Sequence, residues 1–386
     1  MKSFLWRIYL YRFLDSFILI GTIFTLFFQN LGLDPYKIAL LISIWSVTTL
    51  ILEVPSGMLA DKFSRRNLLI LGLVLQTVGF VFWLFGGFFN FAIGFILWGT
   101  KNALASGTLE AFVYDELKSY ESQQLYEQVS GKMSGYFSLG LMLSTILGGY
   151  IANTNYTLVL ISSIAITATT IPLLFTMKSV KAVQSTGEVK YLGVLKKAVQ
   201  QIKHNRSLLY LLIFISIVFS VYAATDEFWP LIYSSFDLNT TTIGILVAMG
   251  FGMFSLAGYT VKFFNGDKFK NIDYLLVIAS GVIFLSATVF KSILSLPLIF
   301  LAIYLIKVAN IKFEAKLQHE IASEQRATIS SIKSLVFEFV YLGFVLVFGM
   351  MATKLGVTSI LSIAGGLIFV CGTLPLFTLA KQDKNS

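Results

Sequence analysis

Long apolar runs separated by short polar segments are the feature that most constrains how this chain can fold. Crossing a bilayer takes about 20 apolar residues. Because hydrocarbon cannot satisfy open backbone groups, each crossing run is expected to be helical. The predicted spans are 5–30, 36–58, 67–88, 90–113, 130–152, 156–177, 207–233, 240–264, 272–290, 294–313, 328–352 and 356–379. We therefore predict an all-α membrane protein with twelve transmembrane helices.

The composition agrees with a polytopic membrane protein. The chain is 56% hydrophobic and only 13% charged, whereas about a quarter of the residues of a soluble protein are charged. The net charge of +9 lies in short loops between apolar runs, so it indicates topology rather than nucleic-acid binding. The single cysteine, Cys371, excludes an intrachain disulfide, and the two histidines, His204 and His319, suggest no metal cluster.

Lysine and arginine are concentrated in alternate loops. The opposite set of loops carries only Lys37, Lys291 and Lys354. The positive-inside rule then predicts that both termini and the segment 178–206 are cytoplasmic. The predicted location is the inner (cytoplasmic) membrane of the cell, which the chain crosses several times. Within 178–206, apolar residues recur at helical spacing among lysines, which predicts a short amphipathic linker helix on the membrane surface. The predicted domains are a six-helix bundle over 1–177, this linker, and a second bundle over 207–386.

A charged decapeptide, 57–66, separates the second and third spans. Gly57 is expected to allow close backbone approach. Asp61 lies among Lys62, Arg65 and Arg66, so the turn carries its own ion-pairing partners. The stretch resembles the signature loop of the major facilitator superfamily, G-x-L-a-D-r-x-G-r-k-x-x-l, at Gly57, Leu59, Ala60, Asp61, Arg65, Arg66 and Leu69. A weaker counterpart begins at Gly258, which indicates an internal repeat of two similar halves.

Charges inside the predicted spans follow a period of three. Spans 3, 6, 9 and 12 carry none in their interiors and are expected to face lipid. The charged positions are Arg12 and Asp15 in span 1, Glu53 in span 2, Lys101 and Glu110 in span 4, Asp226 and Glu227 in span 7, Lys307 and Lys312 in span 10, and Glu338 in span 11. The pattern coincides with what the resemblance implies, a central cavity lined by helices 1, 4, 7 and 10.

Five of these residues are candidates for proton coupling: Asp15, Arg12, Glu53, Lys101 and Glu338. Burial favours a protonated carboxyl and a neighbouring cation favours the carboxylate, a balance that suits a proton carrier. The stretch around Lys101 resembles the fourth-helix motif of the superfamily, where drug–proton antiporters use an arginine in coupling. The alternatives are an Arg12–Asp15 ion pair that only packs span 1, and a structural role for Lys101 beside Asp15 or Glu53.

Small residues mark the fifth span. Gly140, Gly148 and Gly149 fit the antiporter pattern g-x-x-x-G-P-x-x-G-G, but Ser144-Thr145 replaces its central Gly-Pro. This departure weakens the assignment of antiport. The alternative is that the glycines serve close helix packing.

Two further groups of site residues are predicted. Pro230 should break span 7 beside two acids and an indole, forming either a substrate contact or an aromatic belt. The substrate-cavity candidates are Tyr9, Asn102, Asp226, Glu227, Trp229, Lys307 and Asn310. Asp115 should meet Arg65 or Arg66, either as a gate that opens or as a static surface pair. The candidates for this cytoplasmic gate are Gly57, Asp61, Lys62, Arg65, Arg66, Glu110 and Asp115.

These features predict a secondary active transporter that works by alternating access. No G-x-x-x-x-G-K-[ST] loop is present in the sequence, so an ion or solute gradient should supply the energy. The first expectation is proton-coupled export of a drug-like molecule or metabolite. The alternatives are an importer or uniporter of a sugar, peptide or organic anion, and a non-transporting membrane receptor. The expected partners are a small-molecule substrate, protons and the lipid bilayer, with no nucleic acid, enzyme activity, metal or cofactor, in a monomer.

Overall fold

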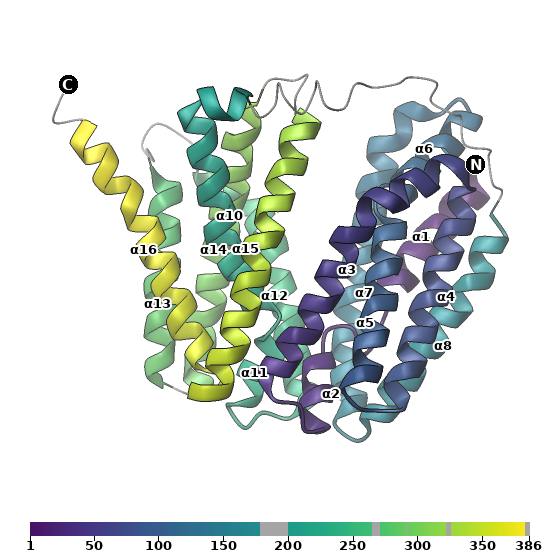
Figure 1. The fold of residues 1–386 in the computed structure, drawn as a ribbon, viewed down its shortest axis with the longest axis horizontal. Helices are drawn as coiled ribbons and strands as arrows, with labels where there is room; N and C mark the ends of the chain where they lie inside the picture. Colours follow the sequence, from purple (N-terminus) through teal and green to yellow (C-terminus); the bar gives the residue numbers. More distant parts are fainter. Residues whose placement is uncertain (178–199, 265–270, 291, 322–325, 383–386) are drawn as a thin grey trace. The chain divides into compact units, whose positions relative to one another are not determined.

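The computed structural model describes residues 1–177, 200–264, 271–290, 292–321 and 326–382, and these ranges contain helices and no strand (Figure 1). In chain order the elements are α1 (Lys2–Ser16), α2 (Phe24–Asn30), α3 (Pro35–Lys62), α4 (Arg65–Leu84), α5 (Phe88–Ala105), α6 (Thr108–Ser119), η1 (Gln123–Leu125), α7 (Tyr126–Ala152), α8 (Tyr156–Phe175), α10 (Arg206–Asp226), α11 (Trp229–Ser234), α12 (Thr240–Thr260), η2 (Val261–Phe264), α13 (Ile272–Phe290), η4 (Ile293–Ser295), α14 (Leu296–Glu320), α15 (Arg326–Leu355) and α16 (Ser359–Gln382).

The predicted fold class is confirmed. Nine helical stretches in the described ranges are long and apolar enough to cross a membrane. The three remaining predicted spans correspond to α1 with α2, α5 with α6, and α16. The protein is therefore an all-α membrane protein whose helix count agrees with twelve spans.

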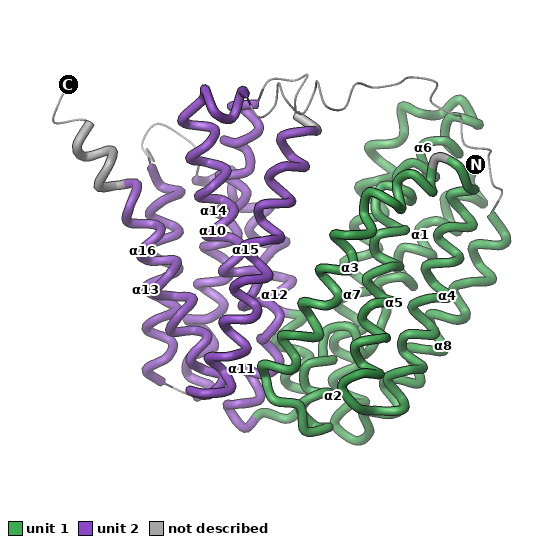
Figure 2. Tube along the Cα trace, viewed as in Figure 1, with its two compact units in different colours: residues 1–187, 238–248 green, residues 188–237, 249–386 purple. Residues whose placement is uncertain are grey.

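The chain divides into two compact units (Figure 2). Unit 1 comprises Met1–Gly187 and Leu238–Ala248, and unit 2 comprises Glu188–Asp237 and Met249–Ser386. The predicted amphipathic linker falls mainly on residues 178–199, which lie outside the described part. The linker and the three predicted domain boundaries therefore stay predictions.

Several helices begin at a side-chain cap that can be recognised in the sequence. The Asp34 carboxylate accepts a hydrogen bond from the Lys37 amide at 2.9 Å, and Pro35 occupies the first turn of α3. Asn155 and Asn205 cap α8 and α10 in the same way. These caps satisfy amides that have no partner within the helix, so they fix where each span starts.

Two predicted spans are not continuous helices. Span 5–30 is divided by a non-helical stretch between Ser16 and Phe24, and span 90–113 is divided at Ser106–Gly107. Gly107 has a φ of +67°, which glycine adopts without a Cβ clash. The predicted continuity of these two spans is wrong, because hydrophobicity alone does not register a local break. The break expected in span 7 is confirmed: α10 ends at Asp226, and Pro230 stands in the first turn of α11.

Contacts from α7 and α8 stabilise the break in span 1. The Ile20 amide donates to the Ser163 hydroxyl at 3.0 Å, and Ser144 donates to the Ser16 carbonyl at 3.3 Å. A side chain at Gly148 would collide with the Leu19 carbonyl oxygen. The close-packing interpretation of the glycines in the fifth span is therefore confirmed.

The charged decapeptide is mostly helix rather than turn. α3 continues through Gly57 to Lys62, α4 begins at Arg65, and the connection is only Phe63 and Ser64. A glycine within a helix costs about 1 kcal/mol relative to alanine, which is too little to end a long apolar helix. An added Cβ at Gly57 would meet no atom of the described chain within 4 Å. The expected close backbone approach at Gly57 is therefore wrong.

Candidate functional site

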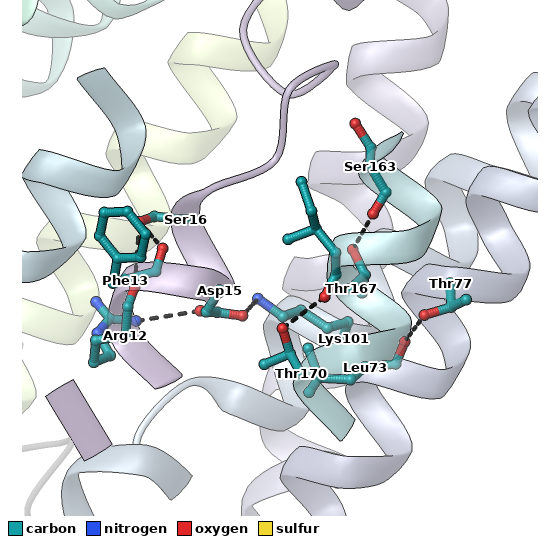
Figure 3. A network of polar contacts seen from close by, with 11 residues as sticks. Arg12, Phe13, Asp15, Ser16, Leu73, Thr77, Lys101, Ser163, Thr167 and Thr170 are labelled. Carbon is teal, nitrogen blue, oxygen red and sulfur yellow. Dashed lines mark hydrogen bonds and ion pairs between the residues drawn. The ribbon is translucent and has the colours of Figure 1, made fainter. Parts of the chain in front are cut away.

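Three charged residues from two helices meet inside unit 1 (Figure 3). Asp15 lies in the last turn of α1, and its Oδ1 is 2.7 Å from Nζ of Lys101 on α5. Its Oδ2 is 3.3 Å from Nη1 of Arg12. The side chains of Asp15 and Lys101 are only 5% and 8% exposed. The structure therefore brings together three of the five proton-coupling candidates in one buried cluster.

The surroundings hold both cations of this cluster in place. The Arg12 guanidinium lies over the Phe137 ring, 4.4 Å from its centre. Gly72 on α4 leaves space for Lys101. A Cβ added at Gly72 would lie only 3.2 Å from Cγ of Lys101. Cation–π contact and tight packing restrict both side chains, so the carboxylate between them has a defined position.

The cluster carries one negative charge against two positive ones. Burying charges is costly unless they are paired, and removing one partner of a buried pair leaves the other uncompensated. Protonation of Asp15 would remove the shared anion of Arg12 and Lys101. The ion pair between Asp15 and Lys101 is therefore a buried electrostatic link between α1 and α5.

The hydroxyls of α8 near this cluster are already engaged, whereas one amide on α4 is not. Ser163, Thr167 and Thr170 each donate to a carbonyl four residues earlier on α8. Gln76 on α4 is fully buried, and within the described residues neither its amide oxygen nor its nitrogen has a hydrogen-bond partner. Sequence analysis missed Gln76, although an amide in the middle of a span expected to face lipid was the available signal.

The two remaining proton-coupling candidates lie elsewhere. Glu53 is exposed on α3 and makes no ion pair in the part of the chain that the structure describes. Lys101 therefore pairs with Asp15 and not with Glu53. Glu338 lies half-buried on α15 in unit 2, where its charge acts on Glu227 and Tyr341.

Unit 2 contains a second polar cluster at the break between α10 and α11. Oδ1 of Asp226 accepts hydrogen bonds from the Tyr222 hydroxyl at 3.1 Å and from the Trp229 indole at 2.9 Å. The Tyr341 hydroxyl donates to Oε1 of Glu227 at 2.9 Å. Aromatic donors therefore orient both carboxylates, and Trp229 is itself buried and stacked on a neighbouring ring.

Aromatic rings also surround the cation of this unit. Nζ of Lys307 on α14 lies 4.4 Å from the centre of the Tyr222 ring and 4.9 Å from that of Phe254. Tyr222 thus contacts Lys307 with its face and Asp226 with its hydroxyl, so one ring links the cation to the acid. Asn310, one turn further along α14, is half-buried.

The other two cavity candidates belong to unit 1. Tyr9 on α1 stacks on Tyr136 of α7 with ring centres 5.2 Å apart. Asn102 follows Lys101 on α5 and is half-buried. Neither residue contacts the Asp15 carboxylate through a hydrogen bond among the described residues.

The gate candidates lie at the helix ends of unit 1, and the predicted contact of Asp115 is confirmed. Arg65 forms an ion pair with Asp115 of α6 and donates to the Ala111 carbonyl at 3.1 Å. Arg66 donates to the Met177 carbonyl at 2.8 Å. Lys62 and Glu110 are exposed. The side chain of Asp61 lies outside the described residues.

Unit 2 repeats this tie between helix ends with the charges exchanged. Asp273, at the start of α13, forms an ion pair with Lys316 near the end of α14. Lys312 donates to the Phe264 carbonyl at 2.9 Å. In unit 1 the cation, Arg65, is at the start of α4 and the acid, Asp115, is on α6. In unit 2 the acid, Asp273, is at the start of α13 and the cation, Lys316, is near the end of α14. Sequence analysis missed Asp273 as a partner, because the predicted repeat covered only residues 258–268.

Comparison with known families identifies the chain. The model of the Major Facilitator Superfamily matches residues 5–332. The chain belongs to this superfamily. The match includes the signature motif, the charged cluster of unit 1 and most of the polar cluster of unit 2, although Tyr341 and Glu338 lie beyond its C-terminal end. Family and fold are those of a transporter rather than an enzyme.

Solved structures share the fold of this facilitator at low sequence identity. The nucleoside transporter NupG is 13% identical with a TM-score of 0.76, over 96% of this chain and 97% of that one. A D-xylose-proton symporter is 15% identical with a TM-score of 0.69, over 96% of each chain. An inward-facing bacterial homolog of the human lysosomal transporter Spinster is 13% identical with a TM-score of 0.73, over 96% and 97%. A search of curated proteins gave no match.

Proposed function

We propose that this facilitator is a proton-coupled secondary transporter that exports a small organic solute, and that Asp15 carries the coupled proton. The observation that supports this most directly is a buried carboxylate held between two cations, 2.7 Å from Lys101 and 3.3 Å from Arg12. A carboxylate in this position changes the charge balance of the bundle when it gains or loses a proton. Such a change biases the alternating-access equilibrium of a facilitator.

The proposed coupling depends on the ion pairs that Asp15 forms when it is ionised and loses when it is protonated. With Asp15 ionised, its ion pair with Lys101 ties the end of α1 to α5. With Asp15 protonated, Lys101 and Arg12 lose their shared anion, and like charges then repel each other. A buried lysine can release a proton more readily than an arginine can. The lysine in place of the family's arginine therefore supports a site that exchanges protons.

The proposed site of solute recognition is the polar cluster of unit 2, at the break between α10 and α11. Asp226 and Glu227 are oriented by neutral donors from Tyr222, Trp229 and Tyr341. Oriented carboxylates beside aromatic rings suit a solute that has hydrogen-bond donors and an apolar or planar part. Sidedness follows the distribution of lysine and arginine, with both termini in the cytoplasm of a bacterial-type inner membrane.

Import is the second candidate for the direction of transport. The fifth span has Ser144-Thr145 where antiporters of the superfamily have Gly-Pro. One solved structure with the same fold is a D-xylose-proton symporter. Both observations favour symport, in which proton and solute move together into the cell.

Flux measurements in proteoliposomes test coupling and direction together. A thermal-stabilisation screen of nucleosides, pentoses, organic anions and drug-like amines would first identify a ligand. We expect an imposed proton gradient to drive that ligand uphill in the wild type, whereas Asp15→Asn should support only exchange and downhill flux. Asp34→Asn, which alters an exposed helix cap, is the matched control. Uphill transport by Asp15→Asn would disprove the coupling role, and a ligand that binds without any flux would indicate a receptor.

A further inference from the structure

Two arginines from different helices converge on the end of α8 in unit 1. Arg7 of α1 donates from Nη1 to the Thr176 carbonyl at 2.5 Å. Arg66 of α4 donates from Nη1 to the Met177 carbonyl at 2.8 Å. Because the two carbonyls belong to consecutive residues, the two guanidinium groups lie close together at one helix end.

This pair of cations has no acidic partner among the described residues. Neither Arg7 nor Arg66 forms an ion pair within the described ranges. The C-terminal end of a helix offers only about half a negative charge, so about 1.5 positive charges remain uncompensated. An anion that contacts both groups would offset their mutual repulsion.

Both arginines keep N–H donors for such an anion. The two side chains are partly exposed. A guanidinium group has five N–H bonds, and the hydrogen bond to Thr176 uses one of those of Arg7. Nε and Nη2 of Arg66 lie 3.4 Å from the side-chain oxygen of Asn67, beyond the usual hydrogen-bond distance. Paired N–H donors of this kind match the oxygens of a phosphate group.

A buried apolar cluster fixes the positions of the three helix ends that form this site. Its members on both sides of the polar contacts are Phe4 and Ile8 on α1, Leu69 and Ile70 on α4, and Leu174 and Met177 at the end of α8. The packing of these residues holds the two arginines beside each other before any ligand binds. A site that is already formed loses less conformational entropy on binding.

Exposed aromatic rings adjoin the polar contacts in the sequence. Trp6 precedes Arg7 and Phe175 precedes Thr176, and each of these rings is 60% exposed. Phe63, directly before the first turn of α4, is 55% exposed. An exposed indole at the end of a membrane-spanning helix is typical of the lipid headgroup region. Apolar rings beside a cationic pair suit a ligand that has both a phosphate and acyl chains.

We infer that Arg7 and Arg66 bind the phosphate of an anionic phospholipid at the end of α8. The negative charge of the phosphodiester lies between the two guanidinium groups, and the acyl chains run along the exposed rings. A zwitterionic lipid has the same phosphate but brings a further cation to a site that already holds two. The bound lipid ties together the ends of α1, α4 and α8, and this role is independent of the proposed proton coupling.

Lipid titration of the purified protein in detergent tests the site. The probes are dioleoyl-phosphatidylglycerol and dioleoyl-phosphatidylcholine, which have identical acyl chains, and the readout is the midpoint of thermal unfolding. Phosphatidylglycerol should stabilise the wild type at lower concentration than phosphatidylcholine does. Each single variant, Arg7→Gln or Arg66→Gln, should raise the apparent Kd for phosphatidylglycerol about fivefold, and the double variant about thirtyfold.

The matched control is Arg206→Gln, which should leave this Kd unchanged. Arg206 is an exposed arginine at the start of α10 in unit 2, and it contacts no carbonyl of a second helix among the described residues. Glutamine keeps an N–H donor for the carbonyls of α8, and unfolding in phosphatidylcholine checks that each variant is folded. If the double variant does not fold, the single variants decide.

Four outcomes would overturn the lipid site. They are equal stabilisation of the wild type by the two lipids, an unchanged Kd for phosphatidylglycerol in the arginine variants, an equal loss of affinity in Arg206→Gln, and full stabilisation by inorganic phosphate alone. The last result would assign the pair of arginines to a soluble anion. Solute flux enters none of these measurements, so failure of the transport proposal is recognised separately.

Discussion

Spans 1 and 7 open the two halves of the sequence, and each is interrupted directly after an aspartate. α1 ends one residue beyond Asp15, and α10 ends at Asp226. Asp15 is buried between two cations, whereas Asp226 is exposed and held by a phenol and an indole. The same backbone position thus serves two chemistries. In the proposed function, the ion-paired acid exchanges the coupled proton, and the acid held by neutral donors contacts the solute.

The two interruptions also have different origins. In span 7, Pro230 lies in the first turn of α11, so the break is written into the local sequence. In span 1 no proline is present, and the freed backbone groups are satisfied by Ser144 and Ser163 from other helices. A local break persists when its neighbours change, whereas a break stabilised by tertiary contacts depends on them.

The largest effect is expected from removing the charge of each aspartate. Asp15→Asn should abolish uphill transport and lower the free energy of unfolding by about 3–5 kcal/mol, because Lys101 then lacks its buried partner. Asp226→Asn should keep proton coupling and weaken ligand binding about five- to tenfold. Flux assays and thermal unfolding in detergent check both variants. Equal loss of coupling in the two variants would remove the distinction between the units.

A double substitution sharpens this result. Adding Lys101→Met to Asp15→Asn should recover part of the lost stability, because neither charge then remains buried alone. Thermal unfolding of the two single variants and the double variant gives the interaction energy directly. Strict additivity would show that the pair is not coupled.

The origin of the break in span 1 is tested at the glycines of α7. Gly148→Ala should destabilise the protein by about 1–3 kcal/mol, because its Cβ would collide with the Leu19 carbonyl. Gly135→Ala on the same helix is the control, since its Cβ would meet nothing within 4 Å of the described chain. That control should stabilise the helix by about 0.5–1 kcal/mol. Thermal unfolding in detergent measures both variants, and a neutral Gly148→Ala would contradict the tertiary origin of the break.

The recognition role of unit 2 is tested by deleting one donor at a time. Tyr222→Phe removes a hydroxyl from Asp226 and keeps the ring over Lys307. We expect the KM for the solute to rise about fivefold, with an unchanged maximal rate of proton-driven transport. Phe254→Leu, which removes a ring over Lys307 and leaves the bonds of Asp226 intact, separates the cation–π contact from the hydrogen bond. Loss of maximal rate at constant KM in Tyr222→Phe would contradict the assignment.

The smallest expected effect concerns two helix caps, one that titrates and one that does not. Partial burial raises the pKa of Asp34, but hydrogen bonds from the Lys37 amide and ammonium outweigh it and hold the pKa below its ordinary value. A depressed pKa in the folded state adds stability above the ordinary value of about 3.9, and this stability is lost as the pH falls below it. Asp34→Asn should keep the cap and remove this acid dependence. Asn155, the cap of α8, does not titrate, so Asn155→Ser should leave the dependence of thermal unfolding on acidic pH unchanged.

The sequence by itself determined the features that depend on local chemistry. Apolar length fixed the helical spans, since lipid leaves backbone groups no other partner. Pro230 predicted its break, and the opposite charges of Arg65 and Asp115 predicted their ion pair. Each of these follows from residues close in sequence or from the strong attraction between opposite charges at helix ends.

The tertiary structure alone decided which distant groups meet. Lys101 had Asp15 and Glu53 as possible partners, and the tertiary arrangement of the helices brings Lys101 to Asp15. The break between Ser16 and Phe24 also depends on which helix faces lie together. So does the burial of the Gln76 amide, which has no hydrogen-bond partner within the described ranges. Hydrophobic spans are nearly equivalent in composition, so their pairing is set by small residues and buried polar groups whose effects appear only once the helices are packed.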